Sequence, residues 1–172
     1  MRVFTAGHGV RSAPELVAIL RAAGVGTVVD VRRFPTSRRH PHFSQEPLAA
    51  SLVGAGIAYR HESELGGRRT GEPGEDRFAC IQTAAFRSYV ARMSRPEYQT
   101  ALSRALEEPA PCFLCAETLW WRCHRRFIAE LLAARGHEVI HLIRPHELQR
   151  HRPMAEADVR EGKLFLCGTI VA

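Results

Sequence analysis

Short apolar runs alternate with longer amphipathic segments along this chain. The run at residues 27–31 is continuous and β-branched, which is typical of a strand buried on both faces of a sheet. Further apolar runs predict strands at residues 3–6, 56–60, 111–115 and 138–143. The strand pattern is therefore spread along most of the chain.

Helical spacing separates these runs. Leu16 and Leu20 fall on the apolar face of a helix predicted at residues 13–23, with Ser12 as its N-cap and Gly24 at its end. The same kind of spacing predicts helices at residues 45–54, 84–93, 96–108 and 122–135, a weaker helix at 147–161, and an edge strand at 164–167.

Strands that alternate with helices predict one α/β domain over residues 1–172. The expected architecture has three layers: a mostly parallel sheet with helices on both faces, Rossmann-like or flavodoxin-like. In such sheets, ligands bind outside the carboxyl ends of the strands, where the strand order reverses. Polar residues that directly follow a strand are therefore the candidates for a functional site.

Composition limits the partners of this domain. The chain has no apolar run near the ~20 residues that a membrane span needs, and its N-terminus does not resemble a signal peptide, so we expect a cytoplasmic protein with no membrane partner. The net charge is +6, and Lys163 is the only lysine. Guanidinium groups suit phosphates, so we expect a phosphorylated or nucleotide-like small molecule, or nucleic acid, bound by a monomer or homodimer.

The first candidate motif is Thr5-Ala6-Gly7-His8-Gly9, at the end of the first predicted strand. Gly7 would let the backbone approach a ligand closely, although both glycines also fit a plain tight turn. The spacing is not that of the dinucleotide-binding fingerprint. His8 is a titratable group at a strand end and is a candidate catalytic residue.

The second motif follows the strand at 27–31. Asp30 closes a buried strand, so its carboxylate needs a partner, and Arg32 falls on the same strand face. We therefore expect Asp30 in the catalytic site, with Arg32 and Arg38 as phosphate ligands. Arg33 and Arg39 fit a solvated basic loop better.

The third motif is the richest in reactive groups. Cys115 ends a strand, Glu117 follows it, and Cys123 and His124 open the next helix. Glu117 and His124 are candidate catalytic residues, and a helix start lowers a thiol pKa. The cysteines also fit two other roles, as small buried hydrophobes or, with His124, as metal ligands. Candidate ligand-binding residues nearby are Arg122 and Arg125, with Gly66 and Gly67 in a flap.

The chain has five cysteines, and an odd number in a protein expected to be cytosolic argues against a disulfide framework. This leaves reduced thiols, a catalytic thiol or a metal site open. The motifs require no cofactor, unless Cys115, Cys123 and His124 bind a metal ion.

The order of these motifs resembles the family called "domain of unknown function 488". The resemblance rests on Thr5, Gly7 and His8; Asp30, Val31 and Arg32 with Ser37, Arg38 and Phe43; Leu65, Gly66 and Gly67; and Cys115, Ala116, Glu117, Cys123, His124 and Arg125. It extends to about residue 145. Gly9 departs from the pattern, where a serine or threonine is expected in many relatives. The resemblance implies the α/β fold and a shared site, without a reaction.

Three functions fit these motifs. The first is a hydrolase, N-glycosidase-like, that acts on a nucleotide, nucleoside or nucleic-acid base, with arginines on the phosphate and Glu117 as general base. The second is a nucleic-acid-binding module without catalysis. The third is a metal or thiol-redox protein that uses Cys115, Cys123 and His124.

Overall fold

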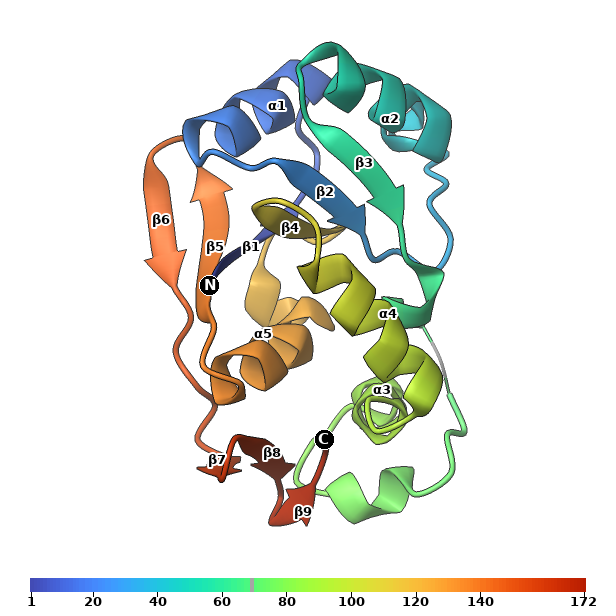
Figure 1. Ribbon diagram of the computed structural model, residues 1–172. Coiled ribbons are helices and arrows are strands. Elements are labelled where there is room, and N and C mark those ends of the chain that lie inside the picture. The colour runs from blue at the N-terminus through green and yellow to red at the C-terminus, as the bar shows by residue number, and fades with distance from the viewer. Residues whose placement is uncertain (69) are drawn as a thin grey trace.

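A computed structural model of the chain describes residues 1–68 and 70–172 and confirms the α/β fold (Figure 1). Its main sheet has the strand order β3-β2-β4-β1-β5-β6. The pairs among the first five strands in this order are parallel, and β6 runs antiparallel to β5. The strands are β1 (Arg2–Gly7), β2 (Thr27–Asp30), β3 (Ala58–His61), β4 (Pro111–Cys115), β5 (Glu138–Arg144) and β6 (Glu147–Arg150).

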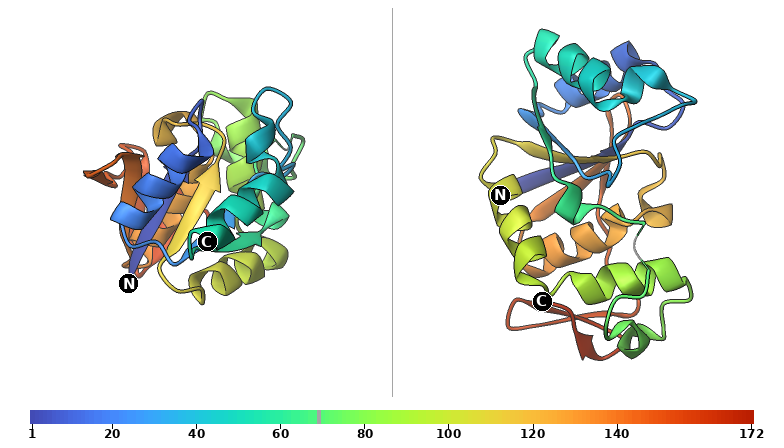
Figure 2. Two further views of the ribbon diagram at one scale, coloured as in Figure 1. Left: turned by 90° about the horizontal axis from the view of Figure 1, so that it is seen from above. Right: turned by 90° about the vertical axis from the view of Figure 1, so that its right-hand side faces the viewer.

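The helices form two layers, one on each face of this sheet (Figure 2). One apolar core joins α1 and α2 to side chains such as Phe4, Val28 and Leu114, and the other joins α3, α4 and α5 to side chains such as Val29 and Phe113. Neighbouring residues of a strand point to opposite faces, so each central strand serves both cores. The helices are α1 (Ala13–Ala22), α2 (Gln45–Gly54), α3 (Ala84–Arg92), α4 (Pro96–Leu106) and α5 (Arg125–Ala134).

Local signals explain where α1 begins. The Ser12 side chain accepts the amide of Glu15, and the Glu15 carboxylate accepts the amide of Ser12, which is a complete capping box. Pro14 lies in the first turn, where no amide proton is needed. None of the described helices is both long and apolar enough to cross a membrane.

The helix predicted at 147–161 is wrong. Residues 147–150 form β6, which makes a hairpin with β5 through the turn at Pro145 and His146, and residues 157–160 form β7. Pro153 cannot donate a helical hydrogen bond, and it interrupts the segment. Residues with a high helix propensity, such as Glu147, therefore lie in a paired strand.

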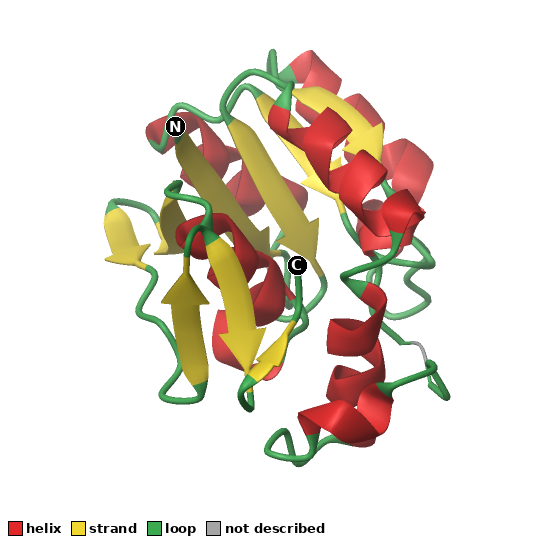
Figure 3. Cartoon of the chain, turned by 60° about the horizontal axis from the view of Figure 1, so that its bottom comes forward, coloured by secondary structure: helices red, strands yellow, loops and turns green. Residues whose placement is uncertain are grey.

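The predicted edge strand at 164–167 lies elsewhere than expected. β8 (Lys163–Leu166) is the central strand of a second sheet, between β7 (Ala157–Arg160) and β9 (Thr169–Ile170) (Figure 3). Leu164 and Leu166 are fully buried in the same core as α5. The C-terminal segment is thus held to the outside of the α3–α5 layer by its apolar face.

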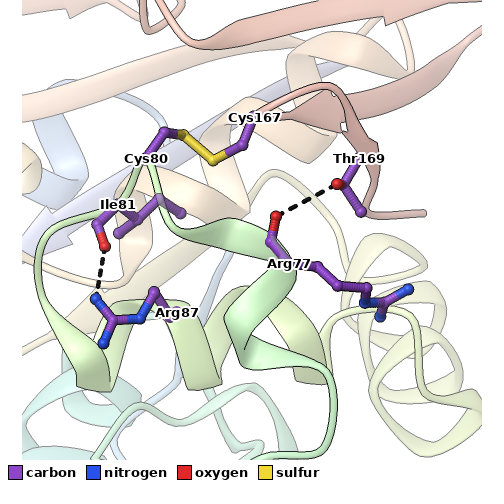
Figure 4. The surroundings of a disulfide bond; sticks show 6 residues. All are labelled: Arg77, Cys80, Ile81, Arg87, Cys167 and Thr169. Atoms are coloured by element: carbon purple, nitrogen blue, oxygen red, sulfur yellow. Dashed lines mark hydrogen bonds between the residues drawn. A yellow bond between two sulfur atoms is a disulfide. The ribbon is translucent and has the colours of Figure 1, made fainter.

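The expectation of reduced cysteines is also corrected in part. Cys80 forms a disulfide with Cys167, and the Thr169 hydroxyl donates to the carbonyl of Arg77 at 3.3 Å (Figure 4). This pairing leaves three free cysteines, all buried: Cys112, Cys115 and Cys123. An odd cysteine count does not exclude a single bridge between distant segments.

Candidate active site at the switch point

The connections of β1 and β4 leave the sheet in opposite directions. β1 leads through α1 to β2, while β4 leads through α5 to β5, and α1 and α5 cover opposite faces. The two strands are neighbours, with Gly7 opposite Cys115 at their carboxyl ends. This is the point where the strand order reverses, which is where α/β sheets bind ligands.

A cavity of about 360 Å³ opens at this point. Segments far apart in the sequence contribute to it, among them the segments that follow β1, β2 and β4. Its lining includes these residues: His8, Arg32, Arg33, Phe34, Thr36, Ser37, Gly67, Arg68, Ala85, Phe86, Tyr89, Cys115, Ala116, Glu117, Arg122, Cys123 and His124.

Gly7 sets the spacing between the two strand ends. A β-carbon at this position would lie 1.8 Å from the carbonyl oxygen of Glu117, so no side chain fits there. The close approach continues past the strands, where the amide of His8 donates to Cys115 at 3.0 Å and that of Gly9 donates to Ala116 at 2.8 Å. Both loops therefore leave the sheet as one fixed unit.

His8 is held as a neutral imidazole. Its ring stacks on Phe43 with 4.3 Å between centroids, and its Nδ1 lies 3.0 Å from the carbonyl of Gly9, which can only accept. Nδ1 therefore carries the proton, and Nε2 faces an N–H of Arg32 at 3.4 Å. Burial lowers the pKa of His8 to about 4, and the positive charge of Arg32 acts in the same direction.

Asp30 holds Arg32 from behind. The Asp30 carboxylate is fully buried and accepts from Nε of Arg32 at 2.9 Å, from NH2 at 2.5 Å and from the hydroxyl of Tyr59 at 2.8 Å. Arg32 also donates from NH1 to the carbonyl of Phe43 at 2.7 Å. Burial opposes the charge on Arg32, but the hydrogen bond to Asp30 raises the pKa of Arg32 above its usual value. A fixed cation thus lies at the cavity wall.

Cys115, Cys123 and His124 lie together on the face of the sheet that α3 and α5 cover. Nδ1 of His124 is 3.9 Å from Sγ of Cys115 and 3.6 Å from Sγ of Cys123. The hydrogen bond from the Cys115 thiol holds the pKa of Cys123 well below its usual value. The same bond, together with burial, keeps the pKa of Cys115 well above its usual value. Among the described residues, these three form a group with the donor types of a metal site.

The outer part of the cavity is more open. Glu117 and Arg122 are exposed, and the Phe34 ring is 59% exposed, with the Arg33 guanidinium over it at 5.0 Å from the ring centroid. Arg33 also donates to the carbonyl of Arg68 at 3.1 Å, which joins the two loops of the rim. The rim therefore combines cations, an aromatic face and a carboxylate.

A comparison with family models agrees with the motifs. The model described as "Domain of unknown function DUF488" matches residues 12–132. The chain belongs to the DUF488 family. Neither the curated proteins nor the solved structures include a significant match. The matched residues include the Asp30, Gly67 and Cys115–His124 motifs, while the Gly7-His8 motif precedes them.

Some of the predicted site residues of this DUF488 protein lie outside the cavity lining. Arg125 is buried behind the cavity lining, where it donates to the hydroxyl of Thr5 at 3.4 Å and to the carbonyl of Glu117. Gly66 packs against the backbone of Arg33, and Arg38 is exposed outside the lining. Asp30 and Gly7 are likewise absent from the lining, so five of the predicted site residues of the DUF488 protein do not line the cavity.

The structure also adds residues that the motifs did not indicate. Phe86 and Tyr89 of α3 line the cavity, although their helical spacing is that of ordinary core residues. Phe34 and Arg68 flank predicted motifs and reach the cavity through loop geometry. For Arg68 the sequence holds a signal, because arginines directly follow the Gly66-Gly67 pair, and Phe34 is a large apolar side chain in a mostly polar loop.

Proposed function

We propose that this DUF488 protein is a hydrolase that acts on a nucleotide, nucleoside or nucleic-acid base in the switch-point cavity. One observation carries the proposal. A single cavity is lined by Arg32, Arg68 and Arg122, by the exposed ring of Phe34 and by the carboxylate of Glu117. Cations suit a phosphate, an aromatic face suits a base, and a carboxylate suits proton transfer.

The positions of these groups favour separate roles. Arg32 is buried and fixed by Asp30, so it holds an anionic group without the cost of ordering a mobile side chain. Arg122 and Arg68 are exposed at the rim and meet a charged substrate first. Phe34 offers its ring to a base at the same rim.

The proposed reaction is N-glycosidic bond hydrolysis. Water adds its oxygen to the sugar carbon, its proton passes to Glu117, and the carbon–nitrogen bond breaks while the base takes a proton from solvent. A carboxylate stabilises the positive charge that develops on the sugar. Neutral His8 accepts a hydrogen bond from Arg32 and positions that guanidinium.

The test is turnover of a panel of nucleosides, nucleotides and oligonucleotides, measured as release of the free base. Glu117→Gln removes the proton acceptor and keeps the shape, so we expect at least a hundredfold loss in kcat with an unchanged melting temperature. Glu46→Gln, an exposed position on α2, is the matched control. Equal turnover by the Glu117→Gln variant would refute the role of Glu117.

A nucleic acid is the second candidate ligand. Arg38 and Arg39 are exposed directly after Ser37, which lines the cavity, so the basic surface continues beyond the small-molecule site. A non-catalytic nucleic-acid-binding module would bind DNA or RNA with an affinity that falls steeply with salt. Binding that is absent at low salt would exclude this candidate and leave the small-molecule reaction.

A further inference from the structure

We propose that Cys115, Cys123 and His124 form a binding site for a thiophilic divalent cation such as Zn²⁺, with one coordination position open to the cavity. The three ligand atoms lie within 4.8 Å of one another, and all three residues are buried. Their donor set of two thiolates and one imidazole is a zinc set. It comes from two segments that meet at the sheet edge, the end of β4 and the residues directly before α5.

The two imidazole–sulfur separations are close to those around a tetrahedral ion. With Zn–S bonds of about 2.3 Å and Zn–N bonds of about 2.0–2.1 Å, neighbouring ligand atoms lie about 3.5–3.8 Å apart. Nδ1 of His124 is 3.6 Å from Sγ of Cys123 and 3.9 Å from Sγ of Cys115. Both imidazole–sulfur distances are therefore within a few tenths of an ångström of the tetrahedral values, and all three ligand atoms lie within 4.8 Å of one another.

The imidazole of His124 is already oriented for coordination. Its Nε2 lies 3.2 Å from the carbonyl oxygen of Val31, which can only accept, so Nε2 carries the proton. Nδ1 is then the bare nitrogen, and it faces the two sulfurs. Metal-binding histidines ordinarily have their other ring nitrogen fixed in this way by a backbone carbonyl or carboxylate.

Gly67 leaves space beside the same nitrogen. A β-carbon at Gly67 would lie 2.8 Å from Nδ1 of His124 and 3.1 Å from its Cγ. Any side chain there would press on the imidazole at the atom that coordinates. The glycine thus keeps Nδ1 accessible, and this requirement is independent of the cysteine positions.

Three protein ligands make this a site of the open kind. Structural zinc sites use four protein ligands, while catalytic sites use three and hold water in the fourth position. All three residues line the cavity together with Glu117. An ion there would supply a water of lowered pKa. That chemical role rests on the proposed hydrolytic function, whereas binding of the ion does not.

The test is titration of the full-length, chelator-free protein with Co²⁺ and then Zn²⁺, without any substrate. We expect one equivalent of Co²⁺ to give the visible bands of a tetrahedral ion and a thiolate charge-transfer band, both removed by Zn²⁺. Cys115→Ser and Cys123→Ser should each weaken binding at least a hundredfold, and Gly67→Ala at least tenfold. Cys112→Ala is the matched control, because Cys112 lies on the same strand and packs in the opposite core.

A second measurement needs no variant and so tests the site even if the substituted proteins do not fold. Saturating Zn²⁺ should slow alkylation of Cys115 and Cys123 in the unmodified protein at least tenfold, as read by peptide mass spectrometry. The absence of cobalt bands together with alkylation rates unchanged by Zn²⁺ would overturn the metal site and leave a dithiol pair. Because neither readout uses turnover, this failure is distinct from a failure of the proposed reaction.

Discussion

The Asp30 carboxylate accepts hydrogen bonds from the Arg32 side chain at Nε (2.9 Å) and at NH2 (2.5 Å), and both side chains are buried. The pair fixes the guanidinium at the wall of the cavity. Asp158 and Arg160 have the same two-residue spacing on β7, but both are exposed. The chain therefore contains a buried pair and an exposed pair of the same type.

We expect Asp30→Asn to lower the free energy of unfolding by about 3–5 kcal/mol, because Arg32 would be left as an uncompensated buried charge. Asp158→Asn should cost less than about 1 kcal/mol, as is usual for exposed ion pairs. Urea unfolding of both variants measures the difference. Equal losses in the two variants would contradict the positioning role of Asp30.

Gly7→Ala tests the close approach of the two strand ends. Its β-carbon would overlap the carbonyl of Glu117, so we expect a loss of about 3 kcal/mol or more in unfolding free energy. Gly54→Ala is the control, because a β-carbon at that helical position meets nothing within 4 Å. It should be stabilising by about 0.5–1 kcal/mol. A Gly7→Ala protein as stable as the control would contradict the close approach of the two strand ends.

Stability should fall as the pH drops below about 6.5, the pKa of an unfolded histidine. Burial, and then the neighbouring His151, lowers the pKa of His141 to about 2. The unfolded chain binds the proton and the folded chain does not, so protonation favours unfolding. Around this ring lie Thr5, which bonds to Nδ1 at 2.7 Å, and the stacked ring of Trp120.

From pH 7 to pH 5, His141 alone should remove about 1–2 kcal/mol of unfolding free energy. His8 acts in the same direction, because its folded pKa is also lowered. Urea unfolding at both pH values measures the slope, and His141→Gln should reduce it. A stability that is constant or rises over this range would contradict neutral, buried imidazoles.

The Cys80–Cys167 disulfide closes a loop with a sequence separation of 87. Its removal in a Cys80→Ser, Cys167→Ser double variant should lower stability by about 2–5 kcal/mol. A reductant should lower the melting temperature of the unmodified protein to that of the variant and leave the variant unchanged. Identical melting temperatures with and without reductant in both proteins would show that the bridge contributes nothing.

The sequence predicts the parallel sheet and its helices well, because burial on two faces produces apolar runs and helical spacing that local reading detects. It also predicts that His8, Arg32, Glu117 and His124 meet, since the carboxyl ends of parallel strands share one edge. The helix predicted after residue 146 is wrong, because strand pairing with β5 overrides helix propensity.

The motifs could not predict how deeply each residue of the site is buried. Arg125 and Arg122 look equivalent in sequence, yet Arg125 is buried behind the cavity lining and Arg122 is exposed at the rim. The difference arises because Arg125 begins α5 facing β1, where the hydroxyl of Thr5 accepts its hydrogen bond. The cavity residues Phe86 and Tyr89 depend likewise on how α3 packs, and this is set by the whole core.

The most direct test of ligand binding in the switch-point cavity is a calorimetric titration of the protein with nucleoside monophosphates, each compared with its nucleoside. We expect saturable one-to-one binding that Arg122→Ala weakens about tenfold, or about 1.4 kcal/mol. Arg152→Ala, at an exposed position outside the cavity lining, should bind as the unmodified protein does. Absence of binding across the panel, or equal affinity in the two variants, would contradict a nucleotide-like ligand in the switch-point cavity.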